Sequence, residues 1–197
     1  LEAENKYLES WFESKNDCRK EIYNELVSFI PPHEVSMKVK YGDYYYFSEI
    51  SSDQQYKTYY REINGNKELV LDVNELAKDL DYFNVASITP SPNNHYIAYA
   101  EDLSGRREYN IKIKNLETGQ IIDESIQRSS GSVVWNKNND TIYYALKDPV
   151  TLIENKVFKH KVGTDIKEDI LIYEAENTVF HLHIFESRTK KYLNIYS

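Results

Sequence analysis

The fold of this chain of 197 residues is decided by the stretch Ser91-Pro92-Asn93-Asn94-His95-Tyr96-Ile97-Ala98-Tyr99. Its first half is a polar turn, and its second half is a run of residue types that favour strands. A similar turn and strand recur three more times, with strands that begin at residues 44, 142 and 192. A repeat of roughly 40–50 residues that contains several short strands is typical of a β-propeller.

Each repeat divides into four predicted strands, and the second repeat shows this most clearly. Residues 109–114 alternate between apolar and polar side chains, as expected of a half-exposed strand. Gly119 follows in a tight turn, because glycine adopts positive φ without a steric penalty. The predicted strands are 85–88, 95–100, 109–114 and 121–124 in the second repeat, 35–39, 43–50, 57–63 and 68–71 in the first, and 132–135, 141–146, 156–161 and 170–173 in the third.

We therefore predict a mainly β chain with about three and a half four-stranded blades of a propeller. The blades span about residues 33–80, 84–127 and 131–176, and the next blade begins in 178–197. A propeller closes with about 4–8 blades, so this ring is unfinished and both ends of the chain look cut. The side chains that we expect to be buried between blades are Tyr45, Ile97, Tyr143 and Trp135.

A helical segment, residues 1–32, precedes the propeller domain of residues 33–197. Residues 3–30 form one predicted amphipathic helix, which Pro31 and Pro32 end because proline cannot donate a backbone hydrogen bond. Its apolar stripe consists of Leu8, Trp11, Phe12, Cys18, Ile22, Tyr23, Leu26 and Phe29. We expect this stripe to pack against a sheet. A helix that binds a membrane surface or a partner is disfavoured, because the polar face is mixed in charge rather than basic.

Composition and charge exclude several classes of protein. The chain is 41% apolar, which is enough for a folded core, and its net charge of −8 disfavours a nucleic-acid partner. No apolar run approaches the roughly 18 residues that span a bilayer, so we expect no membrane association. Cys18 is the only cysteine, which rules out an intrachain disulfide and fits a reducing compartment. We expect a cytoplasmic protein.

Side chains that could carry chemistry are few, and each has a structural interpretation. None of the six glycines frames the Gly-x-Ser-x-Gly turn of serine hydrolases, and the stretch 129–132 is interpreted as a loop. His181 and His183 could bind a metal from one strand face, but no cluster of further ligands supports this. Packing or a solvated strand face is the favoured interpretation. A structural role is also predicted for the isolated residues His33, His95 and His160.

Two charged motifs are also better explained by structure than by ligand binding. Residues 72–75 are similar to the start of a calcium loop, but the central Gly and the final Glu of such a loop are missing. Asp72 or Asn74 is therefore predicted to cap a helix at 75–80. Surface ion pairs are the predicted role of a cluster formed by Glu101, Asp102, Arg106, Arg107 and Glu108. We expect no catalytic, cofactor-binding or metal-binding residue in this chain.

Five segments, taken in order, resemble the N-terminal part of the prolyl oligopeptidase family of serine peptidases, and most closely its oligopeptidase B (protease II) branch. They are residues 1–5, 69–77 together with Tyr82-Phe83, 91–99, 102–119, and 131–135. Many propellers share the single blade motifs. Their order, combined with the leading helix and the 69–77 stretch, is specific to the family. The resemblance covers nearly the whole chain.

The resemblance implies a seven-bladed propeller that caps an α/β-hydrolase domain and admits short peptides but not folded proteins. It also implies a Ser-Asp-His triad in that C-terminal domain, cleavage after Arg or Lys, and no cofactor. None of the family's triad or acidic recognition residues falls within these 197 positions. The chain starts after the family's first segment and stops about halfway round the propeller. We therefore expect a non-catalytic fragment of a cytoplasmic serine oligopeptidase, with peptides and the hydrolase domain as partners.

A second hypothesis is a stand-alone propeller-type interaction module whose blade loops bind a partner protein. The two hypotheses differ in what the gene encodes after Ser197: further blades and a hydrolase domain, or a stop codon. Because the ring is unfinished, the end blades of the isolated chain are expected to expose apolar faces, and the strand at 192–196 offers unpaired backbone groups. We therefore also expect the isolated chain to self-associate.

Overall fold

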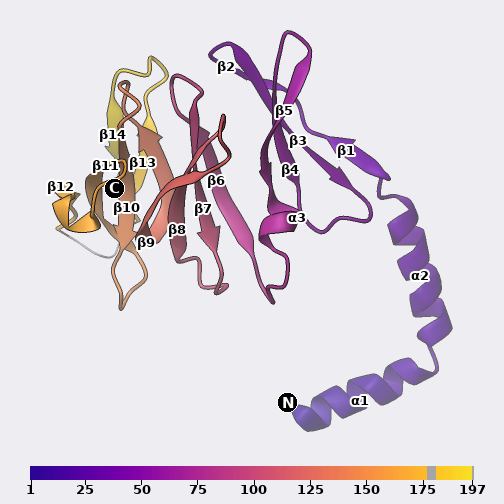
Figure 1. Ribbon diagram of the computed structural model, residues 1–197. Coiled ribbons are helices and arrows are strands. Elements are labelled where there is room, and N and C mark those ends of the chain that lie inside the picture. The colour runs from indigo at the N-terminus through magenta and orange to yellow at the C-terminus, as the bar shows by residue number, and fades with distance from the viewer. Residues whose placement is uncertain (177–180, 197) are drawn as a thin grey trace.

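The computed structural model describes residues 1–176 and 181–196 and shows a helical arm followed by antiparallel sheets (Figure 1). The helices are α1 (Glu2–Glu13), α2 (Asn16–Ser28), α3 (Val73–Leu76) and the 3-10 helix η1 (Ile166–Glu168). The first sheet contains β1 (His33–Val35), β2 (Val39–Tyr41), β3 (Tyr44–Ser51), β4 (Thr58–Ile63) and β5 (Asn66–Asp72). The second contains β6 (Asn84–Pro90), β7 (Tyr96–Asp102), β8 (Tyr109–Asn115), β9 (Ile121–Trp135), β10 (Thr141–Lys147), β11 (Glu154–Lys161) and β12 (Ile170–Glu174), and the third contains β13 (His183–Glu186) and β14 (Leu193–Tyr196).

The second sheet is two propeller blades joined by one long strand, β9. The first part of β9 pairs with β8 as the outer strand of blade 2, and the last part pairs with β10 as the inner strand of blade 3. Arg128 and Gly131 adopt positive φ between the two parts, which turns the chain from one blade to the next. The first sheet is blade 1, and β13 and β14 begin blade 4. The predicted mainly β propeller fold is confirmed.

The core lies between blades, as expected when repeats stack face to face. One buried cluster joins blades 1 and 2, a second joins blades 2 and 3, and a third joins blades 3 and 4. Ile97 and Trp135 are buried as predicted, with 0% and 5% of their surfaces exposed. Tyr143 is half-buried and packs against the cluster between blades 3 and 4. The larger buried ring in that strand is its neighbour Tyr144, on the opposite face.

The prediction for Tyr45 is wrong, since 42% of its surface is exposed. Strand residues alternate between faces, and in β3 it is Tyr46 that faces blade 2. The Tyr46 hydroxyl donates a hydrogen bond of 2.9 Å to Oδ1 of Asn94 in that blade. Tyr45 points to the opposite face of blade 1, against which no blade packs among the described residues.

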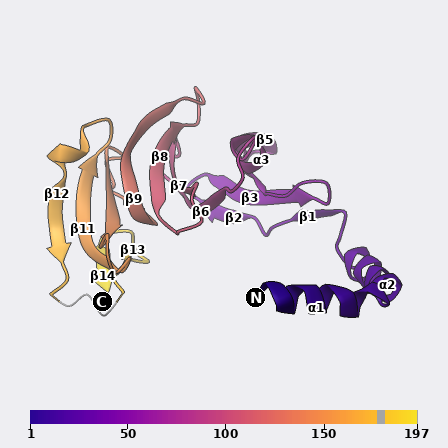
Figure 2. The ribbon, with the colours of Figure 1, turned by 90° about the horizontal axis from the view of Figure 1, so that it is seen from below.

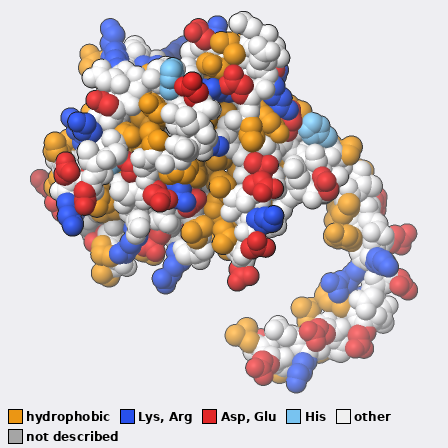
Figure 3. Space-filling model, viewed as in Figure 1, with side chains coloured by type: hydrophobic (Ala, Val, Ile, Leu, Met, Phe, Trp, Pro, Cys, Tyr) orange, Lys and Arg blue, Asp and Glu red, His pale blue; other side chains and the backbone are white. Residues whose placement is uncertain are grey.

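The predicted helical segment is present, but as two helices rather than one. A polar run, Ser14 to Asp17, interrupts the apolar stripe at the break, and its residue types favour helix ends over helix interiors. Neither α1 nor α2 contains a buried residue, and both stand away from the sheets (Figures 1 and 2). The expectation that the stripe packs on a sheet of this chain is therefore wrong. Hydrophobic side chains remain in view along this arm (Figure 3), and Phe29 is 73% exposed.

Candidate functional site at the propeller axis

A pocket of about 320 Å³ lies where the innermost strands of all four blades converge. Its lining comes from Tyr41 of β2, Ser87 and Thr89 of β6, residues 132–135 of β9, and residues 184–186 of β13. Because innermost strands surround the central channel of a propeller, this pocket lies at the axis. We call it the axial pocket.

Hydrogen bonds between neighbouring blades hold the inner strands around the axial pocket. The Ser87 hydroxyl donates to the Gly131 carbonyl at 2.7 Å, and the Trp135 indole donates to the Thr89 carbonyl at 2.9 Å. Each bond connects an inner strand of blade 2 to the inner strand of blade 3. The small Ser87 side chain thus leaves space at the axis while its hydroxyl stays hydrogen-bonded.

The lining of the axial pocket includes an aromatic ring, Tyr41, that has a lysine and a carboxylate near it. Lys190, in the turn between β13 and β14, places its Nζ 3.6 Å from the centre of the Tyr41 ring. Burial raises the pKa of Tyr41 to about 12, and the nearby Glu186 carboxylate adds to this rise. Blades 1 and 4 therefore meet directly at the pocket, although they come from opposite ends of the propeller segment.

A second cavity, of about 280 Å³, lies between blades 1 and 2 and has a different character. Phe47, Tyr60, Val70 and Ile88 are among its lining residues, and none of its described lining residues is charged. It is a gap in the packing of two blades rather than a junction of all four. The axial pocket, which combines charge, aromatic surface and hydroxyl groups, is the better candidate for recognising a ligand.

A buried polar cluster joins blades 2 and 3 around His160, whose surface exposure is 0%. Its Nε2 lies 2.7 Å from Asp123 Oδ2, and its Nδ1 lies 2.6 Å from Asp169 Oδ1. Burial alone would lower the pKa of His160, but the two carboxylates outweigh it and raise the pKa above its ordinary value. The Tyr144 hydroxyl donates to Asp169 at 2.8 Å, and the Gly163 amide donates to Asp123 at 2.6 Å. This geometry supports the predicted structural role of His160.

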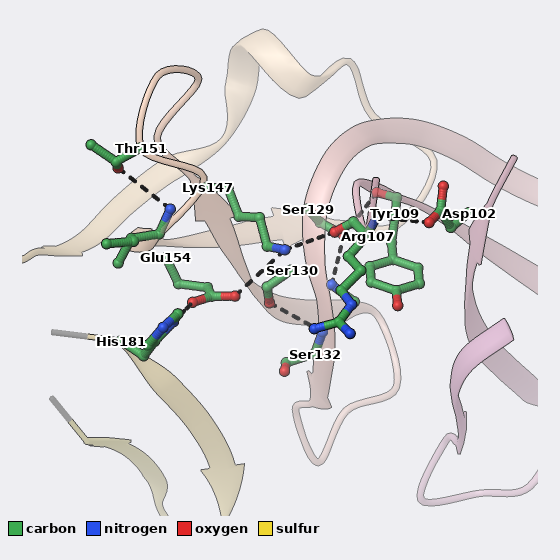
Figure 4. A network of polar contacts seen from close by, with 12 residues as sticks. Asp102, Arg107, Tyr109, Ser129, Ser130, Ser132, Lys147, Thr151, Glu154 and His181 are labelled. Carbon is green, nitrogen blue, oxygen red and sulfur yellow. Dashed lines mark hydrogen bonds and ion pairs between the residues drawn. The ribbon is translucent and has the colours of Figure 1, made fainter. Parts of the chain in front are cut away.

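Another polar network links blades 2, 3 and 4 at the end of the propeller that carries the β7–β8 and β10–β11 loops (Figure 4). Lys147 Nζ donates to the Arg107 carbonyl at 2.7 Å and lies 3.8 Å from a carboxylate oxygen of Glu154. The other oxygen of Glu154 lies 2.7 Å from Nδ1 of His181. Burial would raise the pKa of Asp102, but amide and hydroxyl donors of the 104–107 loop hold it below its ordinary value. The network connects three blades by contacts that are distant in sequence.

The charged cluster around Arg106 and Arg107 does not form the predicted ion pairs. Instead Glu101 pairs with Lys112 at 2.9 Å, and Glu108 pairs with Arg128 at 3.1 Å. Asp102 accepts backbone amide hydrogens of its own loop, including that of Arg107. The donating amides lie two, three and five residues after Asp102, so its carboxylate is satisfied within its own loop without a guanidinium partner.

The remaining sequence predictions have mixed outcomes. Residues 129–132 lie in strand β9 rather than a loop, because Ser129 pairs with both β8 and β10. Asp72 caps a helix as predicted, accepting the amides of Asn74 and Glu75, but the helix is α3 at Val73–Leu76 rather than 75–80. His181 and His183 are exposed with stacked rings, which matches a solvated strand face.

An arc of stacked antiparallel blades around an axial pocket defines a β-propeller domain. The sequence model of the family described as "Prolyl oligopeptidase, N-terminal beta-propeller domain" matches residues 1–197. The chain belongs to this family. Within the described residues there is no α/β-hydrolase domain, and no helix there is long and apolar enough to cross a membrane.

Individual relatives agree with this assignment. The chain is 30% identical over 213 residues to dipeptidyl aminopeptidase BI of Pseudoxanthomonas mexicana, covering 99% of this chain and 30% of the relative. It is 30% identical over 207 residues to protease 2 of Moraxella lacunata, and the match covers 100% of this chain and 30% of that relative. Oligopeptidase B from Leishmania major is similar in structure, with a TM-score of 0.89, 28% identity, and coverage of 96% of this chain and 27% of that one. The chain thus spans about three tenths of the length of these relatives.

Proposed function

We propose that this chain is the substrate-screening part of a serine oligopeptidase similar to oligopeptidase B, which hydrolyses short peptides after Arg or Lys. The observation that carries the proposal is the axial pocket of about 320 Å³, where inner strands of four blades converge, with Lys190 held over the ring of its lining residue Tyr41. Such a space accepts a side chain or a short extended segment, while a folded domain is far larger. The propeller then selects peptides by size before they reach the reacting groups.

The chemistry is supplied by a separate hydrolase domain in this proposal. The described residues contain no nucleophile turn, and no group of three metal-ligating side chains. The 197-residue chain alone is therefore non-catalytic. The intact enzyme needs no cofactor and acts in the cytoplasm, which is consistent with a single exposed cysteine, Cys18.

The helical arm is proposed to pack against that hydrolase domain. Trp11, Ile22 and Phe29 belong to an apolar stripe that no sheet of this chain covers among the described residues. Helices that expose such a stripe bury it against another element in a stable protein. The arm would thereby connect the first blade to the catalytic domain.

Turnover measurements on substrates of increasing size test the proposed function. The parent enzyme, expressed from the complete reading frame, should cleave a short arginyl peptide and an unfolded polypeptide of about 15 residues, but not the same bond in an exposed loop of a folded protein. The isolated chain should cleave none of them, because it lacks nucleophile, base and oxyanion hole. Cleavage of the folded protein at the rate of the short peptide would contradict the size-screening role.

A further inference from the structure

We propose that Tyr41 and Glu186 form a binding site for the cationic side chain of a peptide lysine or arginine, and that Lys190 occupies this site when no peptide is bound. Tyr41 and Glu186 both line the axial pocket. The choice of a peptide as ligand rests on the proposed function. The cation-binding chemistry itself follows from the contacts of three side chains.

The Tyr41 ring already holds an ammonium group. Lys190 Nζ lies 3.6 Å from the ring centre, well inside the limit of about 6 Å for a cation–π interaction. Tyr41 is half-buried, and removal of water strengthens such a contact. The structure thus shows that this face of the ring accepts the functional group that a lysine substrate would present.

Glu186 supplies the negative charge of the site. Glu186 lines the axial pocket together with Tyr41, and its charge adds to the effect of burial in raising the pKa of the Tyr41 hydroxyl. Among the described residues no ion pair within 4.0 Å involves Glu186, although Lys190 and Lys191 line a neighbouring cavity with it, so its carboxylate can pair with an incoming cation. A single carboxylate beside an aromatic face suits an organic cation, since a divalent metal ion requires about six oxygen ligands.

Lys190 is placed so that a ligand can displace it. It is exposed, it lies in the turn between β13 and β14, and its backbone adopts φ of 55°, which is uncommon for a residue other than glycine. Its long side chain can turn into solvent without moving a strand. The axial pocket carries the hydroxyls of Thr89 and Ser132, which can hydrogen-bond a peptide backbone.

Calorimetric titration of this chain tests the site with three blocked tripeptides, acetyl-Gly-X-Gly-amide, in which X is lysine, arginine or norleucine. The two cationic peptides should bind more tightly than the norleucine peptide. Lys190→Met removes the internal competitor and should tighten binding of the cationic peptides by about 2- to 5-fold, the range of an exposed cation–π contact. Arg188→Met, at an exposed position of the same turn, is the matched control and should leave binding unchanged.

Two further variants separate the ring from the charge. Glu186→Gln should weaken the cationic peptides and leave the norleucine peptide unaffected. Tyr41→Phe keeps the aromatic face and should retain binding, whereas Tyr41→Leu should lose about 2- to 5-fold. Equal binding of the norleucine peptide, or no response to Lys190→Met, would overturn the proposal.

This test is independent of catalysis. If the parent enzyme selects substrates by size but this chain shows no preference for cations, the cation site is wrong and the proposed function stands. If the preference is found but the parent shows no size selection, the proposed function is wrong and the site stands.

Discussion

The buried cluster of His160, Asp123 and Asp169 makes the stability of this propeller depend on pH. The cluster joins blade 2 to blade 3, with both ring nitrogens of His160 within 2.7 Å of a carboxylate oxygen. A carboxylate next to each ring nitrogen favours the doubly protonated ring, and the pKa of His160 is raised, so we expect His160 to be a cation in the folded chain near pH 6. Replacing His160 with Gln removes that cation and leaves two carboxylates buried together.

The expected loss can be estimated from the burial of the three groups. The side chains of His160, Asp123 and Asp169 are 0%, 4% and 3% exposed. Removing one partner from a buried charge pair costs roughly 3–5 kcal/mol, because the remaining charge has neither water nor a partner. We therefore expect His160→Gln to lower the free energy of unfolding by about 3–5 kcal/mol near pH 6.

The sign of the pH dependence follows from the direction of each pKa shift. The pKa of His160 is raised on folding, so its contribution is complete below about pH 6.5 and is lost as pH rises toward the folded pKa. In that interval the folded state holds one more proton, and stability falls by about 1.4 kcal/mol per pH unit. The pKa of Asp123 is lowered, because hydrogen bonds from His160, Gly163 and Ser125 outweigh burial. Its contribution is present above about pH 4 and is lost in acid.

Urea denaturation followed by circular dichroism at pH 6, 7 and 8 measures this dependence. The original chain should lose stability across the series, whereas His160→Gln should be nearly flat. His95→Gln, at an exposed position, is the control and should retain the original slope. Nitrogen-15 NMR of the imidazole gives a second readout that does not depend on the variant folding. A neutral His160 ring at pH 7.5 in the folded chain would refute the reasoning.

Three further predictions concern stability and association. Trp135→Ala should lower the free energy of unfolding by roughly 3–5 kcal/mol, as for other buried aromatic residues, whereas Tyr45→Ala should cost less than about 1 kcal/mol; urea denaturation distinguishes them. Asp72→Ala should cost about 1 kcal/mol through the lost cap of α3, while Asp81→Ala, in an exposed loop, should be neutral in the same assay. The outer strand β12 exposes four consecutive large side chains, so the chain should self-associate in a sedimentation series, and Ile172→Lys should reduce the effect; a monomer at all concentrations would contradict this.

The blades could be predicted from sequence because their signals are local. The turn position that ends each inner hairpin is occupied by Gly42, Asn94, Asn139 and Lys190, all with positive φ. A polar turn followed by a short strand-forming run marks each hairpin, wherever it lies in the chain. The repeat also fixes contacts between neighbours, as when the Asn93 amide donates to the Asn139 side chain one repeat later at 2.8 Å.

Features that depend on more than one repeat could not be predicted. In β3 we predicted that Tyr45 faces the neighbouring blade, but Tyr46 does. A shift of one position exchanges the two faces of a strand. His160 was recognised as structural, but its partners Asp123 and Asp169 come from a different blade and a different element. The apolar stripe of helices α1 and α2 predicts that this face is buried, but the sequence of the stripe does not identify the surface that covers it.

The axial pocket shows the same limit at the site itself. Tyr41, Glu186 and Lys190 are unremarkable when each is read in its own repeat, since each is a polar or charged residue near a turn. They become a site only because stacked blades curve round an axis, which brings the first inner strand opposite the fourth. Curvature is the sum of small rotations between blades, and those rotations are set by the side chains packed at each blade interface. A substitution in the clusters between blades can therefore change the distance between Lys190 and Tyr41 without touching either residue. For this reason the contacts that pack the blades together also determine the geometry of the binding site at the axis.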